Sequence, residues 1–193
     1  MLDENKIYQN KLAFVNLLAC LDIDITELYS YLESVDYFNK PASTQYFKAY
    51  SGGLCEYALD LYYELAQLVN AYHPGKYSKA DVVKVALFKD LYRAELYESY
   101  LKNVKNDITG QWEVQTAFRY KEQRPTFGDI GFSSYMIAKR FIPFTDEQIE
   151  AITQSAAKSD YAGDIHMIMR TYPLVTLTKM ADIAATYLSN SAV

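Results

Sequence analysis

Residues 85–97 read VALFKDLYRAELY, a segment in which charged residues interrupt an apolar helical pattern. The spacing of its apolar residues predicts that this segment belongs to a helix that begins near Ser78. Lys89 and Arg93 are four residues apart, so they share a face of that helix, and Asp90 lies beside them. Two interpretations stay open at this point: an ion-pair cluster at the surface, or a polar site that faces the interior of the protein.

Apolar residues recur at helical spacing in most of the remaining chain. The pattern predicts two short helices near the N-terminus, a longer helix that ends before a Pro-Gly pair, and a final helix near the C-terminus; they fall at residues 13–21, 25–32, 54–72 and 174–188. Ser78 with Asp81, and Thr145 with Gln148, have the spacing of capping boxes that begin further helices.

One stretch breaks the helical pattern. A group of turn residues is followed by Trp112, Val114 and Thr116, which alternate with polar residues. This alternation predicts a β-hairpin inserted near residues 100–120. Because we find no linker and no internal repeat, the sequence predicts an all-α fold with one inserted hairpin, in a single domain that spans residues 1–193.

The composition excludes several classes of protein. The chain has 193 residues and a net charge of −5, so bulk attraction to nucleic acid is not expected. No apolar run approaches the roughly 18 residues of a membrane-spanning helix, and acidic residues near the N-terminus argue against a targeting peptide. We therefore expect a cytoplasmic protein that does not contact membranes. Residues 76–124 hold ten bases and seven acids, which indicates either a solvated face or a local anion site.

Few residues are available for metal binding or nucleophilic catalysis. With two histidines and two cysteines, an ordinary zinc or iron site is nearly excluded, and we expect no cofactor. His73 is predicted at a helix end and His166 on a helix, and neither lies near a nucleophile motif. Cys20 and Cys55 fall in apolar helical patterns, which is typical of buried free thiols. Residues 51–53 read SGG before a helix, which is either a simple turn or a place where backbone N–H groups meet a phosphate.

A series of six segments carries a family resemblance. The first is residues 42–59, ASTQYFKAYSGGLCEYAL, and the others follow in order at residues 85–97, 103–113, 127–137, 141–152 and 172–188. Jointly they resemble the motifs of the HD superfamily of metal-dependent phosphohydrolases, and most closely its small bacterial and phage branch. The resemblance covers residues 41–189 and implies a helical HD-like bundle, with residues 1–40 as preceding N-terminal helices.

The positions at which this family holds its metal are mostly altered. The resemblance implies ligation by a histidine, by the His-Asp pair and by a final aspartate. In this chain Tyr57 and Lys89 occupy the two histidine positions, while Asp90 and Asp182 are retained. Other histidine positions of the branch hold Phe47, Asp129 and Ser155. Two carboxylates without imidazoles make a poor transition-metal site, so no metal is expected.

These departures indicate a catalytically inactive HD-fold protein, in which the Lys89 ammonium replaces the metal and neutralises Asp90 and Asp182. In the first hypothesis the old pocket binds a nucleotide or a similar phosphate ligand, and a phage protein of this kind would sequester a host signalling nucleotide. The candidate ligand-binding residues are Lys48, Tyr57, Lys89, Asp90, Arg93, Asp129 and Asp182. The cationic side chains would bind the phosphate of the ligand, and tyrosine rings would stack on its base.

Two other functions stay open. The chain would be a protein–protein interaction or inhibitor module if Phe47, Tyr57 and Phe88 fill the old pocket. It would be a metal-independent phosphohydrolase if Asp129, a weak catalytic candidate, acted as a general base. The sequence leaves the oligomeric state open.

Overall fold

The computed structural model describes residues 2–106, 108–123, 128–154 and 162–188. In chain order its elements are α1 (Glu4–Leu18), η1 (Ala19–Leu21), α2 (Thr26–Ser34), η2 (Tyr37–Asn39), α3 (Gly53–Tyr72), α4 (Lys79–Phe88), α5 (Arg93–Leu96), β1 (Tyr97–Lys105), β2 (Trp112–Tyr120), α6 (Ile130–Ala138), α7 (Asp146–Gln154), α8 (Ala162–Thr171) and α9 (Pro173–Tyr187), where η marks a 3₁₀ helix. The predicted mostly helical fold with an antiparallel hairpin is confirmed.

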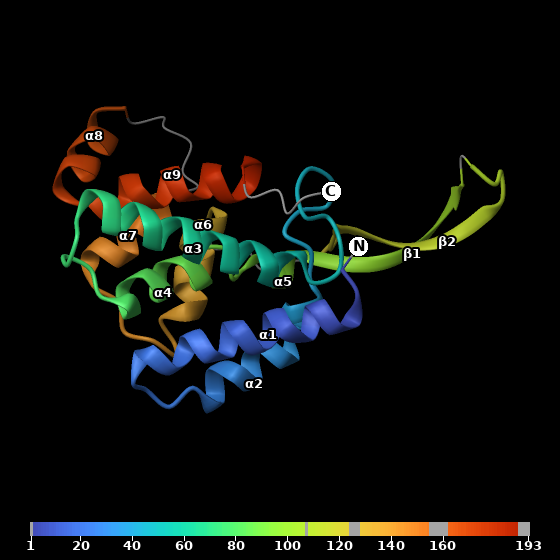
Figure 1. Cartoon of the computed structure of the whole chain (residues 1–193), viewed down its shortest axis with the longest axis horizontal. Coiled ribbons are helices and arrows are strands. Elements are labelled where there is room, and N and C mark those ends of the chain that lie inside the picture. Colours follow the sequence, from blue (N-terminus) through green and yellow to red (C-terminus); the bar gives the residue numbers. More distant parts are fainter. Residues whose placement is uncertain (1, 107, 124–127, 155–161, 189–193) are drawn as a thin grey trace.

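Helix α3 contacts α1, α4 and α9, and in Figure 1 it lies between α9 and the N-terminal helices. Buried side chains form two clusters. The N-terminal core includes Phe14, Leu32 and Phe88, and the C-terminal core includes Leu61 and Val175. Helices α3 and α4 contribute to both clusters, so the N-terminal helices pack on the same two helices as the rest of the chain. Each fully buried Leu or Phe contributes about 1.5–3 kcal/mol.

Two glycines allow the chain to turn tightly at the start of α3. Gly52 has a φ of +84°, in the left-handed region that favours glycine. A Cβ on Gly53 would lie 2.1 Å from the carbonyl oxygen of Lys48, so no other residue fits there without movement of the loop. The N–H groups of Gly53 and Leu54 already donate to carbonyl groups of the chain. This arrangement favours the turn rather than the phosphate interpretation of residues 51–53.

Both predicted capping boxes form. At the start of α4, Ser78 Oγ accepts from the N–H of Asp81 at 3.2 Å, and the Asp81 carboxylate accepts from the N–H of Ser78 at 2.8 Å. At the start of α7, Thr145 and Gln148 make the same reciprocal pair at 2.9 and 3.4 Å. The Gln148 amide also donates to Asp81 Oδ1 at 2.7 Å, so the two helix starts are joined.

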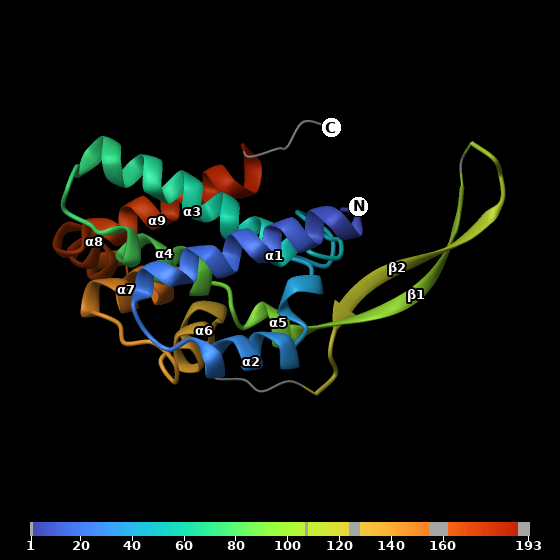
Figure 2. The same cartoon turned by 60° about the horizontal axis from the view of Figure 1, so that its bottom comes forward.

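The hairpin begins earlier than the alternating pattern predicted. Its two strands pair from Tyr97 opposite Tyr120 to Lys105 opposite Trp112. Tyr97 continues the helical spacing of the preceding segment, which hides the start of the strand in the sequence. At the base of the hairpin Tyr97 and Phe118 are buried, and beyond that base β1 and β2 stand away from the helical body (Figures 1 and 2). We call these two strands the arm.

Candidate functional site

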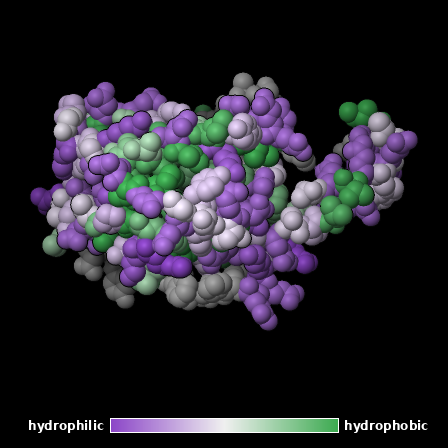
Figure 3. Space-filling model, turned by 90° about the horizontal axis from the view of Figure 1, so that it is seen from below, coloured by the Kyte–Doolittle hydropathy of each residue, from purple (hydrophilic) through white to green (hydrophobic). Residues whose placement is uncertain are grey.

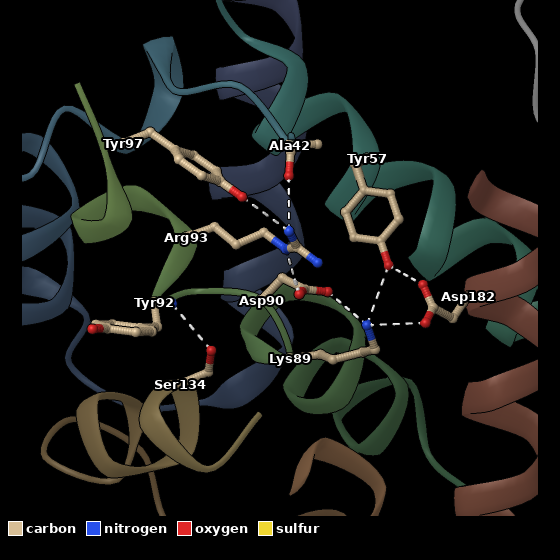
Figure 4. Close-up of polar contacts among 9 residues, drawn as sticks. All are labelled: Ala42, Tyr57, Lys89, Asp90, Tyr92, Arg93, Tyr97, Ser134 and Asp182. Atoms are coloured by element: carbon tan, nitrogen blue, oxygen red, sulfur yellow. Dashed lines mark hydrogen bonds and ion pairs between the residues drawn. The ribbon is translucent and has the colours of Figure 1, made fainter. Parts of the chain in front are cut away.

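The continuous helix predicted to hold Lys89 and Arg93 is interrupted, which corrects the sequence-based expectation. Helix α4 ends at Phe88 and α5 begins at Arg93, and residues 89–92 form turns between them. Several backbone N–H groups here donate to carbonyls three residues back, as in tight 3₁₀ turns. Both cations bind Asp90, but the other contacts of Lys89 lie on α3 and α9, whereas those of Arg93 are the Ala42 carbonyl and the Tyr97 hydroxyl (Figure 4).

The charges of this segment lie in the interior, which decides between the two interpretations left open by the sequence. Lys89 is 2% exposed and Asp90 is 5% exposed. The Lys89 Nζ lies 2.6 Å from Asp90 Oδ2 and 3.3 Å from Asp182 Oδ2 on α9. It also donates to the Tyr57 hydroxyl on α3 at 3.3 Å. The ammonium is therefore surrounded by oxygen atoms from three separate parts of the chain (Figure 4).

Asp90 bridges the two cations through its two carboxylate oxygens. One oxygen pairs with Lys89, and the other accepts from Arg93 Nε at 2.6 Å. Burial by itself would raise the pKa of Asp90, but the positive charges of Arg93 and Lys89 outweigh it and hold that pKa well below its usual range. Asp90 is therefore an ionised carboxylate that depends on both partners.

Tyr57 closes the other side of the cluster. Its hydroxyl donates to Asp182 Oδ1, and the ring is 1% exposed. Burial, together with the negative charges of Asp90 and Asp182, raises the pKa of Tyr57, so the phenol stays protonated and serves as a donor. The Phe47 ring packs on Tyr57 with 5.3 Å between centroids. Phe88, the third residue expected to fill the pocket, instead packs in the N-terminal core.

Two partners of Arg93 were not identified from the sequence. Its Nη1 donates to the Ala42 carbonyl at 3.1 Å and to the Tyr97 hydroxyl at 3.2 Å. A backbone carbonyl leaves no side-chain signal, whereas the four-residue spacing of Arg93 and Tyr97 could have indicated their contact. On the neighbouring helix α6, Ser134 Oγ accepts from the N–H of Tyr92 at 3.1 Å and holds the turn in place (Figure 4).

Two candidate residues have their contacts elsewhere. The Lys48 Nζ lies 3.2 Å from Glu56 and 2.8 Å from Asp60, and its side chain is 9% exposed. The carboxylate of Asp129 accepts a backbone N–H bond at 2.8 Å as the N-cap of α6. The structure therefore gives both side chains partners that are not members of the Lys89 cluster. Ser155 lies outside the described residues.

The histidines and Cys55 occupy the places that the sequence indicates, whereas Cys20, expected to be buried, is partly exposed. His73 is the C-cap residue of α3, and His166 is exposed on α8. Cys20 and Cys55 are free thiols, and Cys55 is buried. These residues come from different elements and build no common site with the Lys89 cluster.

The cluster is balanced in charge and its oxygens are occupied. The cations Lys89 and Arg93 face the carboxylates of Asp90 and Asp182, and each carboxylate oxygen is bound by an ammonium, a guanidinium or a phenol. Only the outer edges meet solvent, because the Arg93 side chain is 17% exposed and that of Asp182 is 28% exposed. A general base needs an oxygen that can reach a substrate proton. This arrangement is instead suited to hold α3, α9 and the turn between α4 and α5 together.

Comparison of the chain with protein-family models, with curated proteins and with solved structures finds no match. The described part of the chain holds no helix whose length and apolar character would suffice to cross a bilayer. Within the same residues, no three or more His, Cys, Asp or Glu side chains gather in a group that could hold a metal ion.

Proposed function

We propose that this chain is a catalytically inactive HD-like protein, in which the Lys89 ammonium stands where a metal ion would otherwise lie. The observation that carries the proposal is the position of this ammonium among Asp90, Asp182 and the Tyr57 hydroxyl. These four residues are those at which the family resemblance implies metal ligands. Tyr57, the adjacent pair Lys89 and Asp90, and Asp182 come from three distant parts of the sequence and still meet, which agrees with that resemblance.

The electrostatics support a replacement of metal by lysine. At an effective dielectric of about 20, a unit charge roughly 4 Å from another contributes about 4 kcal/mol. The buried ammonium therefore stabilises the two carboxylates, and it disfavours an additional cation by a similar amount. The metal-independent hydrolase alternative depends on Asp129 as a general base, and that carboxylate instead accepts a backbone N–H bond as the N-cap of α6.

The geometry favours the interaction module over the nucleotide pocket. Phe47 packs on Tyr57, and the cluster beneath them is buried and internally paired. A nucleotide phosphate could reach Arg93 only at the edge and would have to break existing contacts to reach Lys89. We therefore propose that the chain acts by binding another protein through its surface, in the cytoplasm, while the cluster holds the fold together.

The metal replacement is tested by restoring the ligand types. The double variant of Tyr57→His and Lys89→His would place two imidazoles beside Asp90 and Asp182, a set that suits a transition metal. We expect this variant to bind one Mn²⁺ or Zn²⁺ per chain in a titration followed by calorimetry, and the wild type to bind none there. A control with Tyr46→His and Lys139→His adds the same residue types at two exposed positions.

The outcomes separate the alternatives. Binding by the cluster variant but not by the control supports the proposal, and equal binding by both, or by neither, contradicts it. The nucleotide hypothesis is tested separately, by native mass spectrometry of the protein as purified from cells. An additional mass of a nucleotide, lost on Arg93→Glu, would overturn the interaction module in favour of a ligand-binding pocket.

A further inference from the structure

The backbone hydrogen bonds of the arm follow one regular pattern. At the tip, the N–H of Asn106 donates to the Gln111 carbonyl at 2.8 Å. At the base, the N–H of Lys121 donates to the Leu96 carbonyl at 2.9 Å. Bonded and non-bonded pairs alternate in an antiparallel ladder, and the pairing between these two ends runs without a bulge. Even-numbered residues of β1 and odd-numbered residues of β2 therefore bond across the arm.

The remaining backbone groups of β2 point away from β1. In the outer part of the strand they belong to Trp112, Val114 and Thr116, whose N–H and carbonyl groups make no backbone hydrogen bond to another of the described residues. Beyond the base of the arm, no other described element runs alongside this side of β2 (Figures 1 and 2). We call the outward backbone groups of these three residues the β2 edge.

The β2 edge lacks the features that protect edge strands. Proteins commonly prevent pairing with another chain by charges, by proline or by a bulge in the exposed strand. Residues 114–118 read VQTAF, with no charge and no proline, and the register of β2 is continuous. Strand β1, by contrast, carries Lys102 and Lys105. The β2 edge is therefore the side of the arm that is open to a further strand.

The side chains next to this edge are apolar. Trp112 and Val114 are 71% and 64% exposed, and Leu101 of β1, on the same face of the arm, is 74% exposed. Figure 3 shows the arm beyond the body, with hydrophobic residues exposed along it. A two-stranded hairpin is marginal in water, and a third strand would both bond to the edge and extend this face. Such a strand would place every second side chain beside Val114.

We infer that the β2 edge binds an extended segment of another protein, which adds to the arm as a third, antiparallel strand with apolar residues at alternate positions. This inference rests on the proposed function, because it names the kind of segment that the interaction module binds. It uses no residue of the Lys89 cluster, so the metal titration and the test of the edge can fail independently.

The probe is a short capped peptide in which Val and Thr alternate between two terminal Lys residues. Trp112 is the only tryptophan of the chain, so its emission reports on the edge. We expect the peptide to shift the emission of the full chain to shorter wavelength in a saturable titration. The same peptide N-methylated at its Val amides is the matched control. It lacks the N–H groups that would face the edge, and it should bind about tenfold more weakly or less.

A variant of the protein tests the edge from the other side. Thr116→Pro removes one outward N–H and leaves the bonds between β1 and β2 in place, because proline is accepted in an edge strand where its nitrogen faces away from the partner strand. It should weaken peptide binding about tenfold. Thr116→Val keeps the N–H and the branched side chain, and it should bind as the wild type does. Circular dichroism checks the fold of both variants.

Four outcomes would overturn the inference. Two are the absence of an emission shift and equal binding of the N-methylated peptide to the wild type, a comparison that needs no variant to fold. The third is undiminished binding by Thr116→Pro. The fourth is self-association of the wild type in sedimentation velocity that is lost in Thr116→Pro, which would make the occupant a second copy. If the edge fails and native mass spectrometry shows no nucleotide, the interaction module stands and only its partner segment is wrong.

Discussion

The Lys89 ammonium lies 3.3 Å from a carboxylate oxygen of Asp182, and this ion pair connects the turn after α4 to the last described helix. The Lys89 side chain is 3% exposed, so its charge depends on protein partners rather than on water. A buried charge without partners is costly in free energy. The loss of one charged residue of the cluster would therefore leave its former partners buried and unpaired.

Replacement of Lys89 by Met should destabilise the protein strongly. Met has a similar length but no charge, so Asp90 and Asp182 would lose a buried partner. Breaking a buried ion pair in this way costs about 3–5 kcal/mol, and we expect the lower end because Arg93 still binds Asp90. Urea unfolding followed by circular dichroism measures the change in the free energy of unfolding.

Lys11→Met is the control for that measurement. Lys11 lies 2.8 Å from Glu33, with side chains that are 27% and 45% exposed. An exposed pair of this kind contributes about 1 kcal/mol or less. If both variants lose the same amount of stability, the buried ion pairs of Lys89 contribute no more to stability than an exposed pair does.

Asp90 should make the protein sensitive to acid. Because the pKa of Asp90 is lower in the folded than in the unfolded protein, its contribution to stability is complete above the unfolded value of about 3.9. That contribution is lost as the pH falls further, since the unfolded chain takes up the proton first. Asp90→Asn should therefore lose less stability than the wild type between pH 6 and pH 3 in urea unfolding. An equal loss in both proteins would show that another group controls the acid transition.

Asp81→Ala should cost more stability than Ser78→Ala. Removal of the Ser78 hydroxyl loses one cap, which costs about 1 kcal/mol. Removal of the Asp81 carboxylate disrupts the same capping box of α4. It also removes the acceptor of the Gln148 amide, and Gln148 is 2% exposed. A buried donor without an acceptor adds about 1–3 kcal/mol. Thermal unfolding of both variants compares the two losses, and equal losses would contradict the link between α4 and α7.

The two thiols should react at different rates. Burial, and to a lesser extent the charge of Glu56, raises the pKa of Cys55 far above its usual range. Burial also raises the pKa of Cys20, which is only partly buried. Since the thiolate is the reactive form, a maleimide at pH 8 should label Cys20 first, and Cys55 only after unfolding. Peptide mass mapping of the native protein checks the order, and early labelling of Cys55 would contradict its placement in the core.

Local signals predicted most of the helices and their ends. The boxes at Ser78 and Thr145 form because a cap needs only residues three positions apart. The hairpin was predicted because Trp112, Val114 and Thr116 alternate, although its first strand begins at Tyr97, where local spacing still indicates a helix.

The cluster could be predicted only in part. Lys89, Asp90 and Arg93 stand out in the sequence because charges are unusual in an apolar helical pattern. Their helical spacing nevertheless gave the wrong relation between Lys89 and Arg93, because the 3₁₀ turns between α4 and α5 have no clear local signal. The meeting of Asp182 with Lys89 was expected from the family resemblance alone.

The sequence by itself determined the helical periods, the caps, the alternating strands and the types of charge available, since these depend on residues a few positions apart. Only the tertiary structure decided that Lys89 is buried between Asp90 and Asp182, and that Lys48 pairs with Glu56 and Asp60 on α3. It also decided that Leu101, Trp112 and Val114 on the arm are exposed. Burial and ion pairing depend on which distant segments pack together, and that is set by the whole core rather than by any local pattern.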